Sequence, residues 1–169
     1  ELSHGHPLVT RYLIEALRNE DAQGRVDLLA GAMTFDGDIQ TVYASALRVI
    51  QNDDDARHVL DFLARAEGPM PLTLLAHAVN EPAIERALRS TRHLLTQTSS
   101  GWSVFHNSFR LFLLAQPRMR LGSVDAGYSS HVYREMARLA REAPADTHQR
   151  WLELRYLARA QDDAAVLAL

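Results

Sequence analysis

The chain has 169 residues, the size of one ordinary domain or of two or three small subdomains packed together. Its 47% hydrophobic and 23% charged residues are average for a globular domain, so disorder is not expected. It has no cysteine and all 18 basic residues are arginine, which excludes disulfides, thiolate metal sites, cysteine nucleophiles, Schiff-base lysines and a P-loop from these residues. No apolar run approaches the roughly 18 residues that span a membrane, and a net charge of −3 does not favour strong non-specific binding to nucleic acid.

The apolar spacing of the first part of the chain is helical. Pro7 suits the first turn of the first helix, Gly24 interrupts the apolar pattern, and Asp38 suits the cap of the third helix. The expected helices cover residues 6–19, 26–32 and 39–50. The third helix is expected to turn Val42, Tyr43, Leu47 and Ile50 inward.

The central part predicts three helices followed by a small β-hairpin. Asn52 or Asp53 caps a helix that Gly68 and Pro69 end, and Asn80 caps another that has Pro82 in its first turn. The expected helices cover residues 53–66, 72–79 and 81–95. Residues 96–98 and 102–105 are rich in β-branched and aromatic side chains around the turn 99–101, which indicates the hairpin.

The last part is helical again. A helix over residues 106–115 ends before Pro117, and residues 122–127 are expected to form a loop. Further helices are expected over residues 128–143, 147–161 and 163–169. Their expected apolar stripes comprise Val132, Met136 and Leu139 on the first, and Trp151, Leu154 and Leu157 on the second.

The order of helix, short helix, helix and hairpin is the layout of a winged helix. We therefore expect a mainly α fold with a helical lid subdomain over residues 1–51, a winged helix over 52–121 and the start of a helical repeat region over 122–169. A helix pair with an open end cannot bury its outer face without a neighbour, so further repeats are expected downstream.

No complete active site can be assembled from the sequence. The carboxylates Asp53, Asp54 and Asp55 suit a helix N-terminus, where the helix dipole stabilises negative charge. The segment 4–6 supplies two histidines without a third metal ligand. Ser108 lies near His106 but lacks an orienting carboxylate.

A DNA-binding surface is a second possibility. The helix over residues 81–95 occupies the recognition position of the expected winged helix. Arg86, Arg89 and Arg92 lie three residues apart on its outer side, where such a stripe could meet phosphates. The alternative is a solvated face balanced by Glu81 and Glu85, in a module that only packs against other domains.

Two segments resemble motifs of one protein family. Gly5-His6-Pro7-Leu8-Val9-Thr10-Arg11-Tyr12-Leu13 is similar to the Gly-x-Pro motif, and Trp102-Ser103-Val104-Phe105-His106-Asn107-Ser108-Phe109 is similar to the winged-helix histidine motif, of STAND-class signalling NTPases, including the NACHT group. Their order, with a helix-rich stretch and a wing between them, carries the resemblance.

The resemblance implies roles for three residues. Gly5 matches the glycine that lets the backbone turn beside the nucleotide, and Pro7 matches the proline that packs on the adenine ring. His106 matches the histidine that reaches the β-phosphate of bound ADP and locks the resting state. His6 occupies the variable middle position of its motif and inherits no role.

The resemblance also implies a larger protein. A P-loop domain upstream would bind ADP or ATP with Mg²⁺, while residues 1–169 would supply the lid, the winged helix and the first helices of a repeat sensor. The parent would be a slow ATPase of bacterial type, acting as a cytoplasmic switch that forms a homo-oligomer on activation. No P-loop, magnesium-binding acidic strand or sensor arginine can be assigned within these residues. A winged-helix transcription regulator and a purely structural interaction module remain the alternatives.

Overall fold

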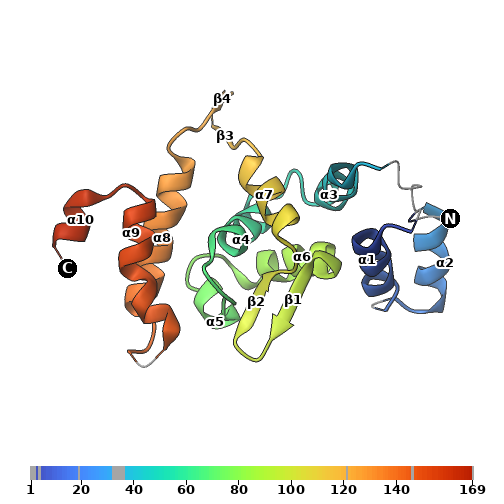
Figure 1. Ribbon diagram of the computed structural model, residues 1–169, viewed down its shortest axis with the longest axis horizontal. Helices are drawn as coiled ribbons and strands as arrows, with labels where there is room; N and C mark the ends of the chain where they lie inside the picture. The colour runs from blue at the N-terminus through green and yellow to red at the C-terminus, as the bar shows by residue number, and fades with distance from the viewer. Residues whose placement is uncertain are drawn as a thin grey trace.

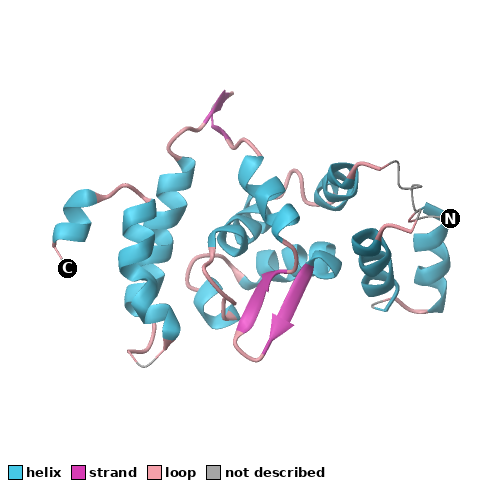
Figure 2. Ribbon diagram, in the orientation of Figure 1, coloured by secondary structure: helices cyan, strands magenta, loops and turns pink. Residues whose placement is uncertain are grey.

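We describe a computed structural model of the chain, in which residues 3, 5–18, 20–31, 37–120, 122–145 and 147–168 are described. The fold is mainly helical, with small antiparallel hairpins, and is arranged as three groups along its long axis (Figures 1 and 2). Helices α1 and α2 lie at one end, α3 to α7 with the larger hairpin form the centre, and α8 to α10 lie at the other end. Within the described part of the chain, no helix is long and apolar enough to cross a membrane.

The N-terminal and central helices have these bounds: α1 Pro7–Arg18, α2 Ala22–Gly31, α3 Ile39–Arg48, α4 Asp54–Arg65, α5 Leu72–Leu75, α6 Glu81–Thr91 and α7 Asn107–Ala115. A 3-10 turn, η1 Arg92–Leu94, joins α6 to strand β1 Leu95–Thr98, which pairs with β2 Gly101–Val104. The second hairpin, β3 Met119–Arg120 and β4 Ser123–Val124, projects from the body between α7 and α8 (Figure 1). The C-terminal elements are α8 Tyr128–Glu142, η2 His148–Leu152, α9 Glu153–Arg159 and α10 Asp163–Leu167.

The caps expected from the sequence form as expected. Asp38 accepts a hydrogen bond from the backbone N–H of Gln40, Asp53 from that of Ala56, and Asn80 from that of Ala83. Each bond satisfies a backbone donor that the first turn of a helix leaves without a partner. The carboxylates Asp53 to Asp55 thus mark the start of α4, as the helix-terminus interpretation predicts.

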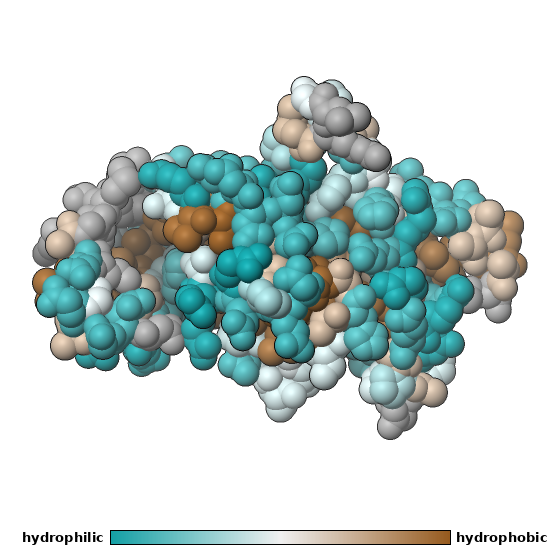
Figure 3. Space-filling model, turned by 180° about the vertical axis from the view of Figure 1, so that it is seen from behind, coloured by the Kyte–Doolittle hydropathy of each residue, from teal (hydrophilic) through white to brown (hydrophobic). Residues whose placement is uncertain are grey.

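The core runs through the central group into the C-terminal one. α4 contributes the fully buried Val59 and Phe62, and α7 contributes Phe109. The buried face of α8 contains the expected Val132, Met136 and Leu139, which pack within the same core. Polar side chains cover most of the outer surface seen from behind, and apolar side chains show only in small patches (Figure 3).

The hairpin is anchored to the segment that follows α4. Met70 and Trp102 exchange backbone hydrogen bonds of 2.7 and 2.9 Å. Gly101 sits beside this bridge with φ of +133°, and a Cβ atom there would lie 2.3 Å from the carbonyl oxygen of Met70. Only glycine fits this position, because a side chain would collide with backbone as well as strain φ.

Several expected boundaries were wrong. Gly24 does not interrupt a helix: Asp21 accepts a hydrogen bond from its N–H at 2.8 Å, so α2 begins before it. The helix expected over 72–79 stops after one turn at Leu75, and the one expected over 81–95 ends at Thr91. Leu95 instead pairs with Val104 in the hairpin, and cross-strand pairing overrides the helical apolar spacing there.

The C-terminal region differs from its prediction in two places. The loop expected over 122–127 contains strand β4. The helix expected over 147–161 begins as the 3-10 turn η2, whose three residues per turn rotate the apolar stripe relative to an α-helix. Trp151 and Leu154 are therefore 77% and 52% exposed, while Leu152, Tyr156 and Leu157 are buried.

Parts of the sequence predictions lie outside the described residues. They concern His4 of the histidine segment, Asn19 at the end of the first helix, residues 32–36 and Leu169.

Candidate functional site

His106 lies at the start of α7, directly after the hairpin. Its backbone is extended, with φ of −130° and ψ of 139°, and its ring Nδ1 accepts the backbone N–H of Ser108 at 3.2 Å. The ring thus caps helix α7. The side chain is also exposed, so capping and ligand contact are compatible.

A chain of hydroxyl groups runs inward from His106. The Oγ atom of Ser108 lies 2.7 Å from Nδ1 of His106 and 2.6 Å from the hydroxyl oxygen of Tyr43 on α3. The Tyr43 hydroxyl lies 3.3 Å from that of Tyr12 on α1. Tyr12 and Tyr43 are both buried, and burial together with the hydrogen bond to Tyr43 raises the pKa of Tyr12, which keeps its hydroxyl protonated.

The same region joins α1 to the hairpin. The guanidinium of Arg11 lies 3.9 Å from the ring centre of Phe105, the residue before His106. The Tyr12 ring meets the Phe105 ring edge-on at 6.3 Å. These contacts bring the helix that begins with Pro7 against the residue next to His106.

The three residues that the family resemblance singles out are exposed, and two of them lie at the start of α1. Gly5 has φ of +75°, a turn that glycine adopts readily, and Pro7 is the first residue of the helix. Within the described part of the chain, the helix that Pro7 begins reaches the start of α7 in two ways: through Arg11 on Phe105, and through the hydroxyl groups that link Tyr12 to His106.

The arginines proposed for DNA contact do not form one free stripe. Nε of Arg86 donates to the carboxylate of Asp53 at 2.5 Å, and this hydrogen bond, followed by the one from the N–H of Ala56, lowers the pKa of Asp53. Arg92 lies beyond the end of α6, with its guanidinium 5.4 Å from the Trp102 ring centre. Arg89 is exposed, and in the described part of the chain it has no ion-pair partner.

An open cleft of about 500 Å³ separates α1 from α6. Its lining comprises Ala16, Glu20, Glu85, Arg89, Ser90, Arg92 and His93. His93 is partly buried and meets the Tyr12 ring edge-on, and burial lowers its pKa to about 4.

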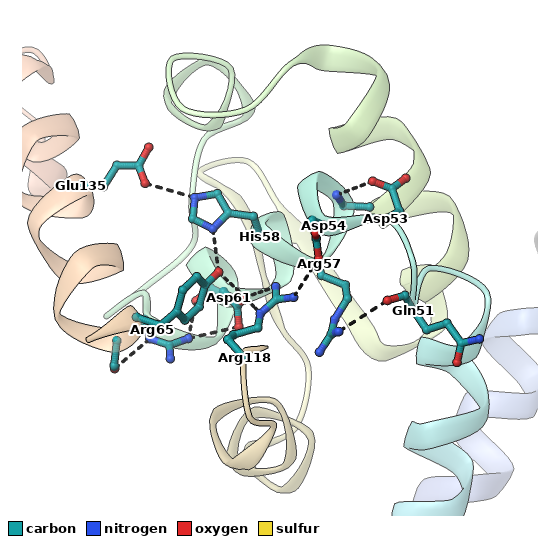
Figure 4. Close-up of polar contacts among 12 residues, drawn as sticks. Gln51, Asp53, Asp54, Arg57, His58, Asp61, Arg65, Arg118 and Glu135 are labelled. Carbon is teal, nitrogen blue, oxygen red and sulfur yellow. Dashed lines mark hydrogen bonds and ion pairs between the residues drawn. The ribbon is translucent and has the colours of Figure 1, made fainter. Parts of the chain in front are cut away.

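A second polar cluster, centred on Asp61 of α4, was not anticipated from the sequence. Asp61 is 6% exposed and accepts hydrogen bonds from Arg118, from Arg65 at 3.3 Å and from the hydroxyl of Tyr128 at 2.8 Å (Figure 4). Burial and the Asp61 carboxylate raise the pKa of Tyr128, so this hydroxyl remains a donor. The spacing of Asp61 and Arg65 by four residues on the apolar side of α4 is the signal that could have revealed the cluster.

The cluster extends onto α8 through His58. Its ring Nδ1 lies 2.8 Å from the Tyr128 hydroxyl, and its Nε2 lies 3.1 Å from the carboxylate of Glu135 (Figure 4). Burial raises the pKa of Glu135, but the His58 hydrogen bond and the nearby positive groups outweigh it, so the pKa is lowered. The central and C-terminal groups are thus joined by polar contacts as well as by apolar packing.

Two findings concern the candidate metal and nucleophile residues. Among the described residues, no group of three or more histidine, aspartate or glutamate side chains could hold a metal ion. Ser108 does contact His106, but within the described part of the chain no carboxylate orients that imidazole.

No protein-family model matches the chain, and no curated protein or solved structure matches it.

Proposed function

We propose that this chain is the regulatory lid and winged-helix part of a STAND-class, NACHT-like signalling NTPase. The observation that carries the proposal is the position of His106. It is exposed at the start of α7 and connected by hydrogen bonds through Ser108 and Tyr43 to Tyr12, on the helix that begins with Pro7. The two segments that resemble family motifs, about a hundred residues apart in sequence, therefore belong to one hydrogen-bonded unit.

The central group supports the assignment of a winged helix to residues 52–121. Helices α4, α5 and α6 are followed, after the 3-10 turn η1, by the β1–β2 hairpin, and α7 follows the hairpin. In this proposal the lid is residues 1–51, and α8, η2 and α9 begin a helical repeat region. The exposed Trp151 and Leu154 on this last pair suit a face that a following repeat would cover.

In the proposed resting state, ADP is held between an upstream P-loop domain and this chain. Gly5 lets the backbone turn beside the nucleotide, Pro7 packs on adenine and His106 donates a hydrogen bond to a phosphate oxygen. An imidazole N–H is a suitable donor to phosphate. Because ADP contacts both parts, it stabilises the closed arrangement over the open one, and sensing by the repeats shifts that population. Exchange for ATP with Mg²⁺ then permits homo-oligomerisation of the cytoplasmic parent.

The test uses the full-length parent protein. We would purify it, denature it and chromatograph the released nucleotide, comparing the parent with His106→Ala and with His131→Ala, an exposed histidine on α8. We expect ADP in the parent and in His131→Ala, less ADP in His106→Ala, and a higher basal signalling activity in His106→Ala. A folded parent that carries no nucleotide, or a His106→Ala variant that retains all of it, would overturn the proposal.

DNA binding is the weaker alternative, because Asp53 already neutralises Arg86 and Arg92 lies over Trp102. If the parent carries no nucleotide, salt-dependent DNA binding that Arg89→Ala weakens would favour a transcription regulator. A parent protein that binds neither nucleotide nor DNA would favour the third alternative, a structural interaction module.

A further inference from the structure

The backbone N–H of Ser108 favours one state of the His106 ring. The N–H of Ser108 can only donate, so Nδ1 of His106, 3.2 Å away, must present a lone pair. A neutral imidazole with a lone pair on Nδ1 carries its proton on Nε2. Nε2 has no hydrogen-bond partner among the described residues, and the side chain is exposed.

The same donor sets the direction of every hydroxyl in the chain. In this tautomer Nδ1 bears no proton, so the Ser108 hydroxyl at 2.7 Å donates to it and shares its lone pair with the backbone N–H. The Ser108 oxygen then accepts from the Tyr43 hydroxyl at 2.6 Å, and the Tyr43 oxygen accepts from the Tyr12 hydroxyl at 3.3 Å. Each hydroxyl donates one hydrogen bond toward His106. Because each bond polarises the next hydroxyl group, the bonds strengthen one another.

We propose that Ser108 and Tyr43 are positioning residues that hold His106 in the Nε2–H tautomer, with its donor presented to an anionic oxygen. The identity of that oxygen as a nucleotide phosphate rests on the function proposed above; the tautomer and its cause do not. Ser108 acts through His106 and Tyr43 acts through Ser108.

Reversing the direction of these hydrogen bonds is unfavourable at both ends of the series. A proton on Nδ1 would face the N–H of Ser108, and the α7 cap would be lost. At the inner end, Tyr12 would have to donate elsewhere. Tyr12 as a whole is 2% exposed, and Tyr43 is the hydrogen-bond partner that its hydroxyl has in the described part of the chain. Leaving a buried hydroxyl without an acceptor is unfavourable.

This arrangement ties the outward donor to α1 and α3. Tyr12 belongs to α1 and Tyr43 to α3, whereas His106 and Ser108 belong to the start of α7. A displacement of α1 or α3 from the start of α7 would remove a hydroxyl donor from this series of hydrogen bonds. The His106 ring would then be held less firmly in its orientation. The orientation of the exposed Nε2 donor of His106 therefore depends on how α1 and α3 pack.

The experiment is nitrogen NMR of the full-length protein with labelled histidine, at a pH high enough for neutral imidazoles, with the His106 signals assigned by their absence in His106→Gln. We expect a lone-pair shift for Nδ1 and an N–H shift for Nε2. Ser108→Ala keeps the backbone donor and removes only the hydroxyl donor, so we expect this variant and Tyr43→Phe to move the two shifts part of the way toward each other. Ser108→Thr keeps the hydroxyl and should keep their separation. Tyr156→Phe removes a buried hydroxyl on α9 and is the matched control, with no change expected.

A second readout is the dissociation rate of ADP from the parent, expected to rise about tenfold in Ser108→Ala, the effect of one hydrogen bond. A parent without nucleotide but with the expected tautomer contradicts the proposed function and leaves the positioning role supported. A proton on Nδ1 in the parent, or shifts unchanged in both Ser108→Ala and Tyr43→Phe, overturns the positioning role whether or not nucleotide is bound.

Discussion

Replacing the buried carboxylate of Asp61 tests the ionic cluster that joins the centre of the chain to α8. In Asp61→Asn the side chain keeps its shape, but Arg65, 5% exposed, and Arg118 keep their charges without a buried counter-ion. Removing one partner of a buried pair costs about 3–5 kcal/mol. We expect the free energy of unfolding to fall by about 3 kcal/mol, at the lower end of that range because an asparagine oxygen can still accept one hydrogen bond.

The assay is urea denaturation followed by circular dichroism, with Asp54→Asn as the matched control. The Asp54 side chain is 96% exposed, and its carboxylate lies 3.9 Å from the guanidinium of the same Arg118, so solvent screens the pair and the control should be nearly neutral. If the two variants differ by less than about 1 kcal/mol, the Asp61 cluster does not carry the electrostatic stabilisation argued here.

Three further predictions concern other parts of the chain. Burial lowers the pKa of His93 to about 4, so between about pH 6.5 and 4 the unfolded chain binds a proton that the folded chain does not bind. The free energy of unfolding, measured in urea, should therefore fall by up to about 3 kcal/mol as the pH drops through this range. His93→Gln should flatten this pH dependence. Gly101→Ala should lower the free energy of unfolding by about 2 kcal/mol or more through backbone collision, whereas Gly122→Ala, with open space around it, should cost about 1 kcal/mol; equal losses in thermal unfolding would contradict the collision. Trp151→Ser should leave the free energy of unfolding and the melting temperature nearly unchanged, whereas Leu157→Ala, in the core, should lower the free energy of unfolding by about 2–4 kcal/mol. A large loss of stability in Trp151→Ser would mean that the face around Trp151 is covered in solution.

Most of the helices could be predicted because their signals are local. Asp38, Asp53 and Asn80 cap helices through hydrogen bonds to N–H groups two or three residues away, so the sequence around each cap contains the whole interaction. Wrong boundaries arose where a competing interaction was misjudged. Leu95 leaves the helical pattern for a strand partner nine residues on, and Gly24 follows a cap at Asp21 that was not recognised.

In the candidate site, too, the residues with local signals were found from the sequence and those joined by distant contacts were not. His106 was identified from its motif and Ser108 from its nearness in sequence. Tyr43 was expected only as an inward-facing residue, since nothing in its local sequence shows that its hydroxyl meets Ser108, 65 residues on. The Asp61 cluster was missed because its partners Arg118, Tyr128 and, through His58, Glu135 come from distant segments.

The sequence by itself determined which side-chain chemistry these 169 residues can supply and most of their local structure. The absence of cysteine and lysine, the helical spacing, the caps and the hairpin signal are all properties of short stretches. Tertiary structure decided which polar groups share a bond: it paired Arg86 with Asp53, buried Asp61 among arginines, and placed Tyr12 and Tyr43 behind His106. The physical reason is that a buried polar group must find its partner wherever packing brings one, and packing brings together residues far apart in the chain.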